Sequence, residues 1–183
     1  RTEIDNTNVL KAQLGWYLAL MRHPGLTTPT TQERVMQAAF TAKFSSGCIS
    51  RQVGAVITDE HNSIKATGWN DVPTGQVPCN LRSLPDLINK FDSTSYSKYE
   101  LNDKEFRSKA KEILVHHEKN PGFQGKNLAY CFKDLRNSLK NNENNQVHTR
   151  ALHAEENAFL QIVKYGGQGI FGGKLYTTAF PCE

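Results

Sequence analysis

Two short motifs near the end of the sequence constrain the fold most. His153-Ala154-Glu155 stands where an apolar helical stretch begins, and Pro181-Cys182 follows a short stretch with strand character, GKLYTT. A helix after the first motif and a strand before the second would bring an imidazole, a carboxylate and a thiol together. Either motif alone occurs often by chance, so their order and their structural setting carry the interpretation.

The other periodic stretches fit one α/β domain. Residues 31–47 follow a threonine suited to capping a helix, and they carry apolar residues at helical spacing: Val35, Met36, Ala39, Phe40 and Phe44. Residues 53–69 alternate on either side of a polar turn, which predicts a β-hairpin. A second helix begins near His153 and ends at Gly166-Gly167. The order helix, strand, strand, insertion, helix, strand predicts an αβα sandwich with helices packed on a mixed sheet.

Two segments fall outside this pattern. Residues 1–30 include Pro24, Gly25 and Pro29, which break a helix, and we interpret them as an arm or linker. Residues 71–150 are polar and irregular, with a helix expected at about 103–118 and the low-complexity run NNENNQ at 141–146. We interpret them as a large insertion or lid. We therefore expect a domain over 31–183 that is interrupted at about 71–150 and lacks its C-terminal part.

Composition narrows the function classes. A net charge of +4 suits an anionic small substrate, and the absence of a long Lys/Arg block disfavours extended nucleic-acid binding. Four scattered cysteines form no disulfide framework and favour a reducing compartment: Cys48, Cys79, Cys131 and Cys182. No apolar run approaches the ~18 residues needed to span a bilayer. We expect a cytoplasmic protein with no membrane partner.

The residue types in the two motifs suit a catalytic zinc ion. Such an ion takes three protein ligands and keeps one position open for water, whose pKa it lowers from 15.7 to about 7. His153 and Cys182 suit two of the ligand positions. Glu155 is too close along the chain to chelate beside His153, but its carboxylate can carry a proton from water to N3 of a cytosine ring while ammonia leaves C4. Glu156 points about 100° away around the helix, so we interpret it as a surface charge.

The chain resembles the deoxycytidylate (dCMP) deaminase branch of the zinc-dependent cytidine deaminase superfamily. The resemblance lies in SRQVGAVITDE, ATGWNDVP, LHAEENA and LYTTAFPCE, and covers about residues 31–71 and 148–183. It implies that His153 and Cys182 bind Zn2+ and that Glu155 is the proton carrier. It also implies that Asn70 contacts the nucleoside and that the backbone of Ala154 contacts the pyrimidine edge. The implied reaction converts dCMP to dUMP and releases ammonia.

Further candidates for substrate contacts have equally plain alternatives. Ser50 and Arg51 lie near where a 5′-phosphate would be, but an arginine at a helix C-terminus is also favoured by the helix dipole. Asn70 could be only a turn residue. Trp69 and Phe180 could flank the base, because flat rings sandwich pyrimidines well, or could simply be core residues.

The resemblance has departures that bear on function. Asp71 stands where the family usually has a glycine in a loop linked to control by deoxynucleotide triphosphates, which argues against that control. The signature of the zinc nucleobase deaminases continues Pro-Cys-x-x-Cys, so its second cysteine would lie two residues beyond Glu183. We therefore expect weak zinc binding and no activity from these 183 residues.

Several wider expectations stay open. The arm and insertion resemble those of larger bacterial deaminases that carry an N-terminal kinase-like domain and act against phage. We expect a homo-oligomer. Two other functions remain as alternatives: a polynucleotide deaminase of the tRNA adenosine type, and a non-catalytic scaffold with the deaminase fold. An intact Glu155 argues against the scaffold, because a structural zinc has no use for that carboxylate.

Overall fold

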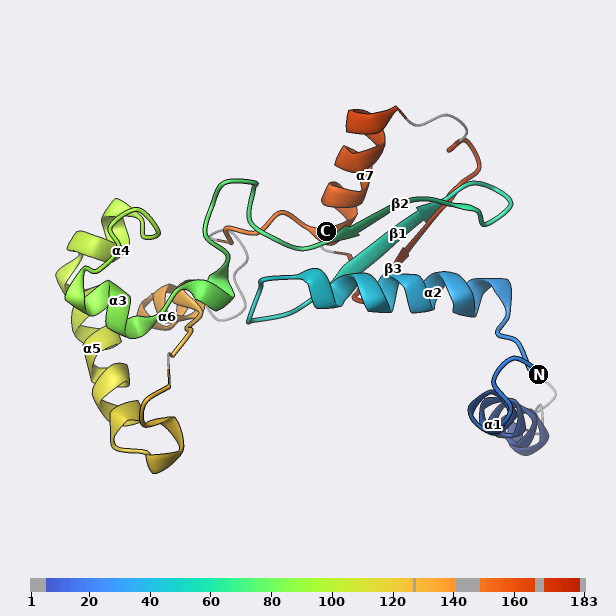
Figure 1. Ribbon diagram of the computed structural model, residues 1–183, viewed down its shortest axis with the longest axis horizontal. Helices are drawn as coiled ribbons and strands as arrows, with labels where there is room; N and C mark the ends of the chain where they lie inside the picture. The colour runs from blue at the N-terminus through green and yellow to red at the C-terminus, as the bar shows by residue number, and fades with distance from the viewer. Residues whose placement is uncertain (1–5, 127, 141–148, 167–169, 182–183) are drawn as a thin grey trace.

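A three-layered sandwich forms the centre of the molecule. The computed structural model describes residues 6–126, 128–140, 149–166 and 170–181. Strands β1 (Gly54–Thr58), β2 (Ile64–Trp69) and β3 (Lys174–Thr177) form a sheet of order β2-β1-β3. Figure 1 shows helices α2 (Thr31–Ala42) and α7 (Ala154–Tyr165) on opposite sides of this sheet. The predicted αβα arrangement of these elements is therefore confirmed.

Strand β1 is buried along its whole length and divides the core in two. Its Ala55 and Ile57 pack with Ala154 and Ala158 of α7. Val56, between them, points to the other face and packs with residues of α2. This alternation follows from the two-residue period of a strand. Because β1 runs antiparallel to both neighbours, the sheet in the described part of the chain is antiparallel rather than mixed.

Helix α2 begins as its sequence predicts but ends at Ala42, where a 3-10 helix over Lys43–Ser45 replaces the expected last turn. Only part of its apolar stripe is buried. Thr30 caps the helix, and the Glu33 carboxylate accepts the Thr30 backbone N–H at 2.7 Å. Val35 and Ala39 are buried. The other stripe residues, Met36, Phe40 and Phe44, are exposed, so the prediction that they pack in the core is wrong. Helical spacing alone did not tell which side of the stripe faces the sheet.

The insertion is a folded unit rather than an irregular loop. It contains α3 (Leu84–Asn89), α4 (Lys98–Asn102), α5 (Lys104–Glu118) and α6 (Phe132–Leu139), which we call the helical lobe. Figure 1 shows this lobe at one end of the sandwich. The helix expected at 103–118 is confirmed as α5, which Asp103 caps. Three short 3-10 helices complete the described elements: Lys43–Ser45, Cys79–Leu81 and Pro121–Phe123.

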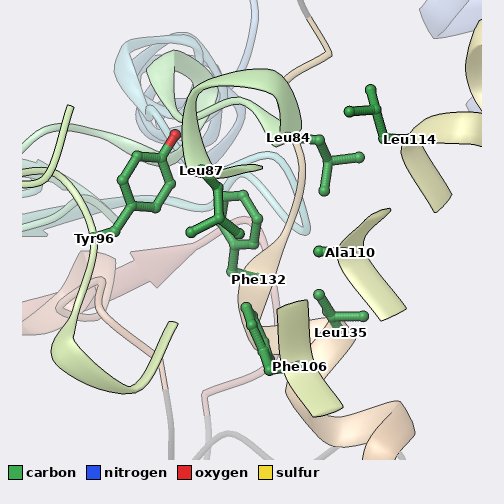
Figure 2. Close-up of a cluster of buried hydrophobic side chains, with 8 residues drawn as sticks. All are labelled: Leu84, Leu87, Tyr96, Phe106, Ala110, Leu114, Phe132 and Leu135. Carbon is green, nitrogen blue, oxygen red and sulfur yellow. The ribbon is translucent and has the colours of Figure 1, made fainter. Parts of the chain in front are cut away.

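The helical lobe has its own apolar core. Figure 2 shows the buried side chains that form it: Leu84, Leu87, Tyr96, Phe106, Ala110, Leu114, Phe132 and Leu135. Beside this core, the buried Arg82 pairs with Glu100 at 2.6 Å and donates to the Ser95 carbonyl at 2.8 Å. A buried arginine with a carboxylate and a carbonyl partner fixes the chain entering α3 to the segment around α4.

The N-terminal arm contains a helix, α1 (Asn6–Arg22), which Figure 1 places at the other end of the sandwich from the helical lobe. The Pro24-Gly25 stretch follows it directly, so the helix breakers end α1 rather than prevent it. Among the described residues, no helix has the length and apolar character to cross a membrane.

Candidate active site

The first turn of α7 carries the most specific motif of the sequence. His153 is the N-cap of the helix, Ala154 is buried against the sheet, and Glu155 is half-buried in the first turn. Glu156 is exposed, and its carboxylate accepts the His153 backbone N–H at 2.7 Å. The two adjacent carboxylates therefore differ in position: Glu156 caps the helix, whereas Glu155 lies at a cavity.

This cavity has a volume of about 730 Å³ and brings together candidates from three parts of the sequence. Its wall includes every candidate binding or catalytic residue of the motifs that the structure describes: Ser50, Arg51, Asn70, His153, Ala154 and Glu155. They come from the loop before β1, from the end of β2 and from the start of α7. Cys182, the remaining candidate, lies outside the described residues.

Asn70 fixes the loop that forms one side of the cavity. Its Oδ1 accepts the Val53 backbone N–H at 2.7 Å and the Ser46 hydroxyl at 2.9 Å, and its Nδ2 donates to the Arg51 carbonyl at 2.8 Å. An amide has two acceptor positions and two N–H donors. Among the described residues, one Nδ2 proton therefore remains for a ligand, and the bond to the Arg51 carbonyl holds Arg51 beside the cavity.

A second hydrogen bond ties β2 to α7. Asn157, one turn after His153, donates from Nδ2 to the Trp69 carbonyl at 2.8 Å. This bond joins the end of β2, which leads into Asn70, to α7, which carries Glu155. Sequence reasoning missed Asn157, although a polar amide among the apolar residues of the helix was a visible signal.

Helix α6 of the helical lobe supplies a wall that the motifs do not predict. The cavity is lined by four residues of α6, together with the motif residues: Lys133, Asp134, Asn137 and Ser138. The Lys133 ammonium lies 3.4 Å from the Asp134 carboxylate, and its side chain is 15% exposed. The insertion therefore contributes residues to the wall of this cavity.

The pattern of the family described as "Cytidine and deoxycytidylate deaminase zinc-binding region" matches residues 29–183. The chain belongs to this deaminase family. Two structures of the dCMP deaminase from the cyanophage S-TIM5 are similar, one in apo form and one in complex with dCMP and dUMP. Each is 21% identical with a TM-score of 0.43, and the match covers 85% of this chain and 70% or 69% of the solved chain. No curated protein matches the chain.

Of the two zinc ligands that the motifs predict, the described residues of the deaminase include one, His153. The family is zinc-binding, and His153 offers an imidazole at the cavity with Glu155 two residues on. Within the described ranges, no three His, Cys, Asp or Glu side chains lie close enough together to hold a metal ion. The donor chemistry present is thus one imidazole beside one carboxylate, as expected for a ligand and a proton carrier.

The two aromatic candidates separate in the deaminase structure. Phe180 lines the cavity and is 91% exposed, so its ring is open to a ligand. Trp69 does not line this cavity, but lies at a shallow hollow formed by β2 and α7. Of the two rings, Phe180 therefore lies at the cavity and Trp69 does not.

Three cysteines described in the deaminase are free and half-buried: Cys48, Cys79 and Cys131. Burial raises the pKa of Cys79, and it raises the pKa of Cys131 to about 11. Both are therefore neutral thiols near pH 7, which suits packing better than nucleophilic chemistry.

Proposed function

We propose that the protein hydrolyses the exocyclic amine of a deoxycytidine nucleotide, converting dCMP and water to dUMP and ammonia. The observation that carries this proposal is the single cavity shared by His153, Glu155, Asn70 and the loop of Ser50 and Arg51. Family membership supports the reaction type. The phage dCMP deaminase bound to dCMP and dUMP illustrates the substrate class for a similar protein.

Each side chain has a role in this reaction. Held by His153 and Cys182, zinc would act as a Lewis acid that makes water nucleophilic near neutral pH. Glu155 takes a proton from the water that attacks C4 and transfers it to N3. As the C4–N bond breaks and the C4 carbonyl forms, Glu155 takes the remaining proton from the C4 hydroxyl and passes it to the amine, which leaves as ammonia. The carboxylate thus ends the cycle as it began.

Substrate orientation comes from groups on the other walls of the cavity. The remaining Nδ2 proton of Asn70 binds an oxygen of the nucleoside. The Ala154 N–H contacts the pyrimidine edge, because N–H groups in the first turn of a helix have no helical acceptor. Phe180 covers one face of the base. Ser50 and Arg51 lie at the end of the cavity suited to the 5′ side of the nucleotide.

The test compares Glu155→Ala with Glu156→Ala in the natural-length, zinc-loaded protein, by ammonia release from dCMP, dCTP, deoxycytidine and a tRNA loop. We expect turnover of the deoxycytidine nucleotides and not of the tRNA. Glu155→Ala should lower the rate about 10²–10⁴-fold. Glu156→Ala should keep the rate and lose about 1 kcal/mol of stability through the lost cap.

Three results would contradict the proposal. Ammonia release that survives Glu155→Ala would exclude the proton-carrier role. Turnover of the tRNA alone would make the protein a polynucleotide deaminase. Silence on all four substrates would favour a scaffold with the deaminase fold.

Two wider parts of the proposal rest on resemblance alone. We propose a homo-oligomer, which light scattering of the purified protein tests. We also propose depletion of deoxycytidine nucleotides during phage infection as the setting. Nucleotide pools measured in infected cells with the wild-type protein and with Glu155→Ala test that role.

A further inference from the structure

A second, smaller cavity adjoins the candidate active site. It has a volume of about 250 Å³, and several residues line both cavities: Cys48, Ser50, Lys133, Thr149 and Ala151. Helix α6 forms part of the wall of each. A ligand with its base against α7 could therefore extend past this shared wall into the smaller cavity.

The smaller cavity has more basic than acidic groups. Four cations line it, namely Arg82, Lys133, Arg136 and Arg150, with one carboxylate, that of Glu100. Glu100 is already bound to Arg82 at 2.6 Å. The Arg150 guanidinium donates to two neutral acceptors, the Val77 carbonyl at 3.3 Å and Gln76 Oε1 at 3.1 Å. Among the described residues, no carboxylate accepts a hydrogen bond from Arg150, and of the carboxylates only Glu100, which already binds Arg82, is near enough to raise the pKa of Arg150.

The positive charges in this cavity repel one another. Burial lowers the pKa of Arg150, and the charge of the nearby Arg82 lowers it further. Removing a charge from water is unfavourable unless an opposite charge accompanies it. An anion in the cavity would supply that charge.

Arg136 supplies a hydrogen-bond donor for such an anion. It lies on α6 three residues after Lys133, so the two side chains share one face of the helix. Its guanidinium lies 4.7 Å from the centroid of the Tyr99 ring. Its Nε is buried, and among the described residues it has no hydrogen-bond partner. Buried donors in folded proteins are nearly always satisfied, and Arg136 lines the cavity.

We propose that the smaller cavity is a phosphate subsite, in which Arg136 and Lys133 of α6, with Arg150, bind the phosphate of the nucleotide substrate. This inference rests on the proposed function, because it places the base in the larger cavity. Lys133 lines both cavities and stands where a phosphate joined to the sugar would pass. Discrimination between nucleotide and nucleoside then resides in the insertion rather than in Ser50 and Arg51 alone.

The test measures equilibrium binding of dCMP, deoxycytidine and inorganic pyrophosphate by calorimetry. All proteins are zinc-loaded and carry Glu155→Ala, so that dCMP is bound without turnover: the wild type in this background, Arg136→Gln and Lys133→Gln, with Arg34→Gln as control. Arg34 is an exposed arginine of α2 that donates to Thr31 Oγ1 at 3.2 Å and lines neither cavity. Circular dichroism establishes that each variant is folded, and Lys133→Gln carries the test if Arg136→Gln is not.

The wild type should bind dCMP about 10–100-fold more tightly than deoxycytidine, as charge-assisted hydrogen bonds to phosphate imply. Arg136→Gln and Lys133→Gln should each remove most of that preference and leave the affinity for deoxycytidine unchanged. Arg34→Gln should change neither. Pyrophosphate should compete with dCMP, and Arg136→Gln should weaken its binding.

Three outcomes would overturn the proposal. Equal affinities for dCMP and deoxycytidine would show that no phosphate is recognised. A preference kept by both variants would place the phosphate elsewhere in the site. Pyrophosphate that depends on Arg136 but does not compete with dCMP would indicate a separate effector phosphate. Failure of the proposed function would differ from all three, because no variant would then bind deoxycytidine, and the protein with Glu155 intact would not release ammonia.

Discussion

Replacement of Gly68 by alanine tests the close packing of α7 on the sheet. Gly68 lies in β2 directly beneath the helix that carries His153 and Glu155. A Cβ at this position would lie 2.9 Å from Ala158 Cα and closer still to the Ala154 carbonyl oxygen and the Ala158 nitrogen. All three are backbone atoms of α7, so no side-chain rotation can relieve the contact.

The size of the effect follows from these contacts. Non-bonded heavy atoms are most favourable at about 3.5–4.0 Å, so α7 must move away from β2 by about 1 Å. Overpacking in a core costs about 1–3 kcal/mol, and contact with backbone places Gly68→Ala at about 3 kcal/mol. In a chain of 183 residues this lowers Tm by roughly 6–12 °C. A displacement of about 1 Å at Glu155 should also lower kcat about 10²-fold.

Urea unfolding followed by tryptophan fluorescence measures this loss. The two tryptophans are Trp16 in α1 and Trp69 in β2, so a Trp16→Phe background leaves the sheet as the reporter. Gly15→Ala is the matched control, because a Cβ at Gly15 would meet no described atom within 4 Å apart from its chain neighbours and the backbone of its own helix. That variant should stabilise α1 by up to about 1 kcal/mol. If Gly68→Ala changes the unfolding free energy by less than about 0.5 kcal/mol, α7 does not pack on β2 as described.

Three further perturbations probe the helical lobe and the site. Burial raises the pKa of Glu100, but the hydrogen bond and charge of Arg82 outweigh it and the pKa falls below 4.5. The stabilisation by this ion pair is therefore present above pH 4.5 and lost in acid. Glu100→Gln should lower the free energy of unfolding by about 3 kcal/mol at pH 7, and its free energy of unfolding in urea should fall less steeply in acid than that of the wild type. Equal pH profiles of the two proteins would contradict this. With a pKa of about 11, Cys131 should react with iodoacetamide at pH 8 roughly 100-fold more slowly in the native than in the unfolded protein; mass spectrometry measures the rates, and equal rates would refute its burial. Asn70→Ala should lower the free energy of unfolding in urea by about 2 kcal/mol, because the hydrogen bond from the Val53 N–H is lost. It should also raise the KM for dCMP, and an unchanged KM would exclude a substrate role for Asn70.

The sandwich was predictable because each of its elements is encoded by neighbouring residues. Alternation around Ala55 and Ile57 depends on the strand period, and the cap of α2 depends on Thr30 and Glu33. The order of elements around His153 then determined which helix starts at the cavity. The exposure of Met36 and Phe40 was not predictable in this way, because it depends on which side of α2 faces the sheet.

The wall formed by α6 depends on contacts that no local pattern reveals. Phe132 and Leu135 have helical spacing, but α6 has only eight residues, too few to distinguish it from a loop by periodicity. Their burial requires Leu87 of α3 and Phe106 of α5, which are distant in sequence. Lys133 and Arg136 of the same helix reach the two adjoining cavities only because that core orients it. The motif residues thus indicate the reaction, whereas the groups that we propose for the rest of the substrate lie on an insertion whose core joins helices distant in sequence.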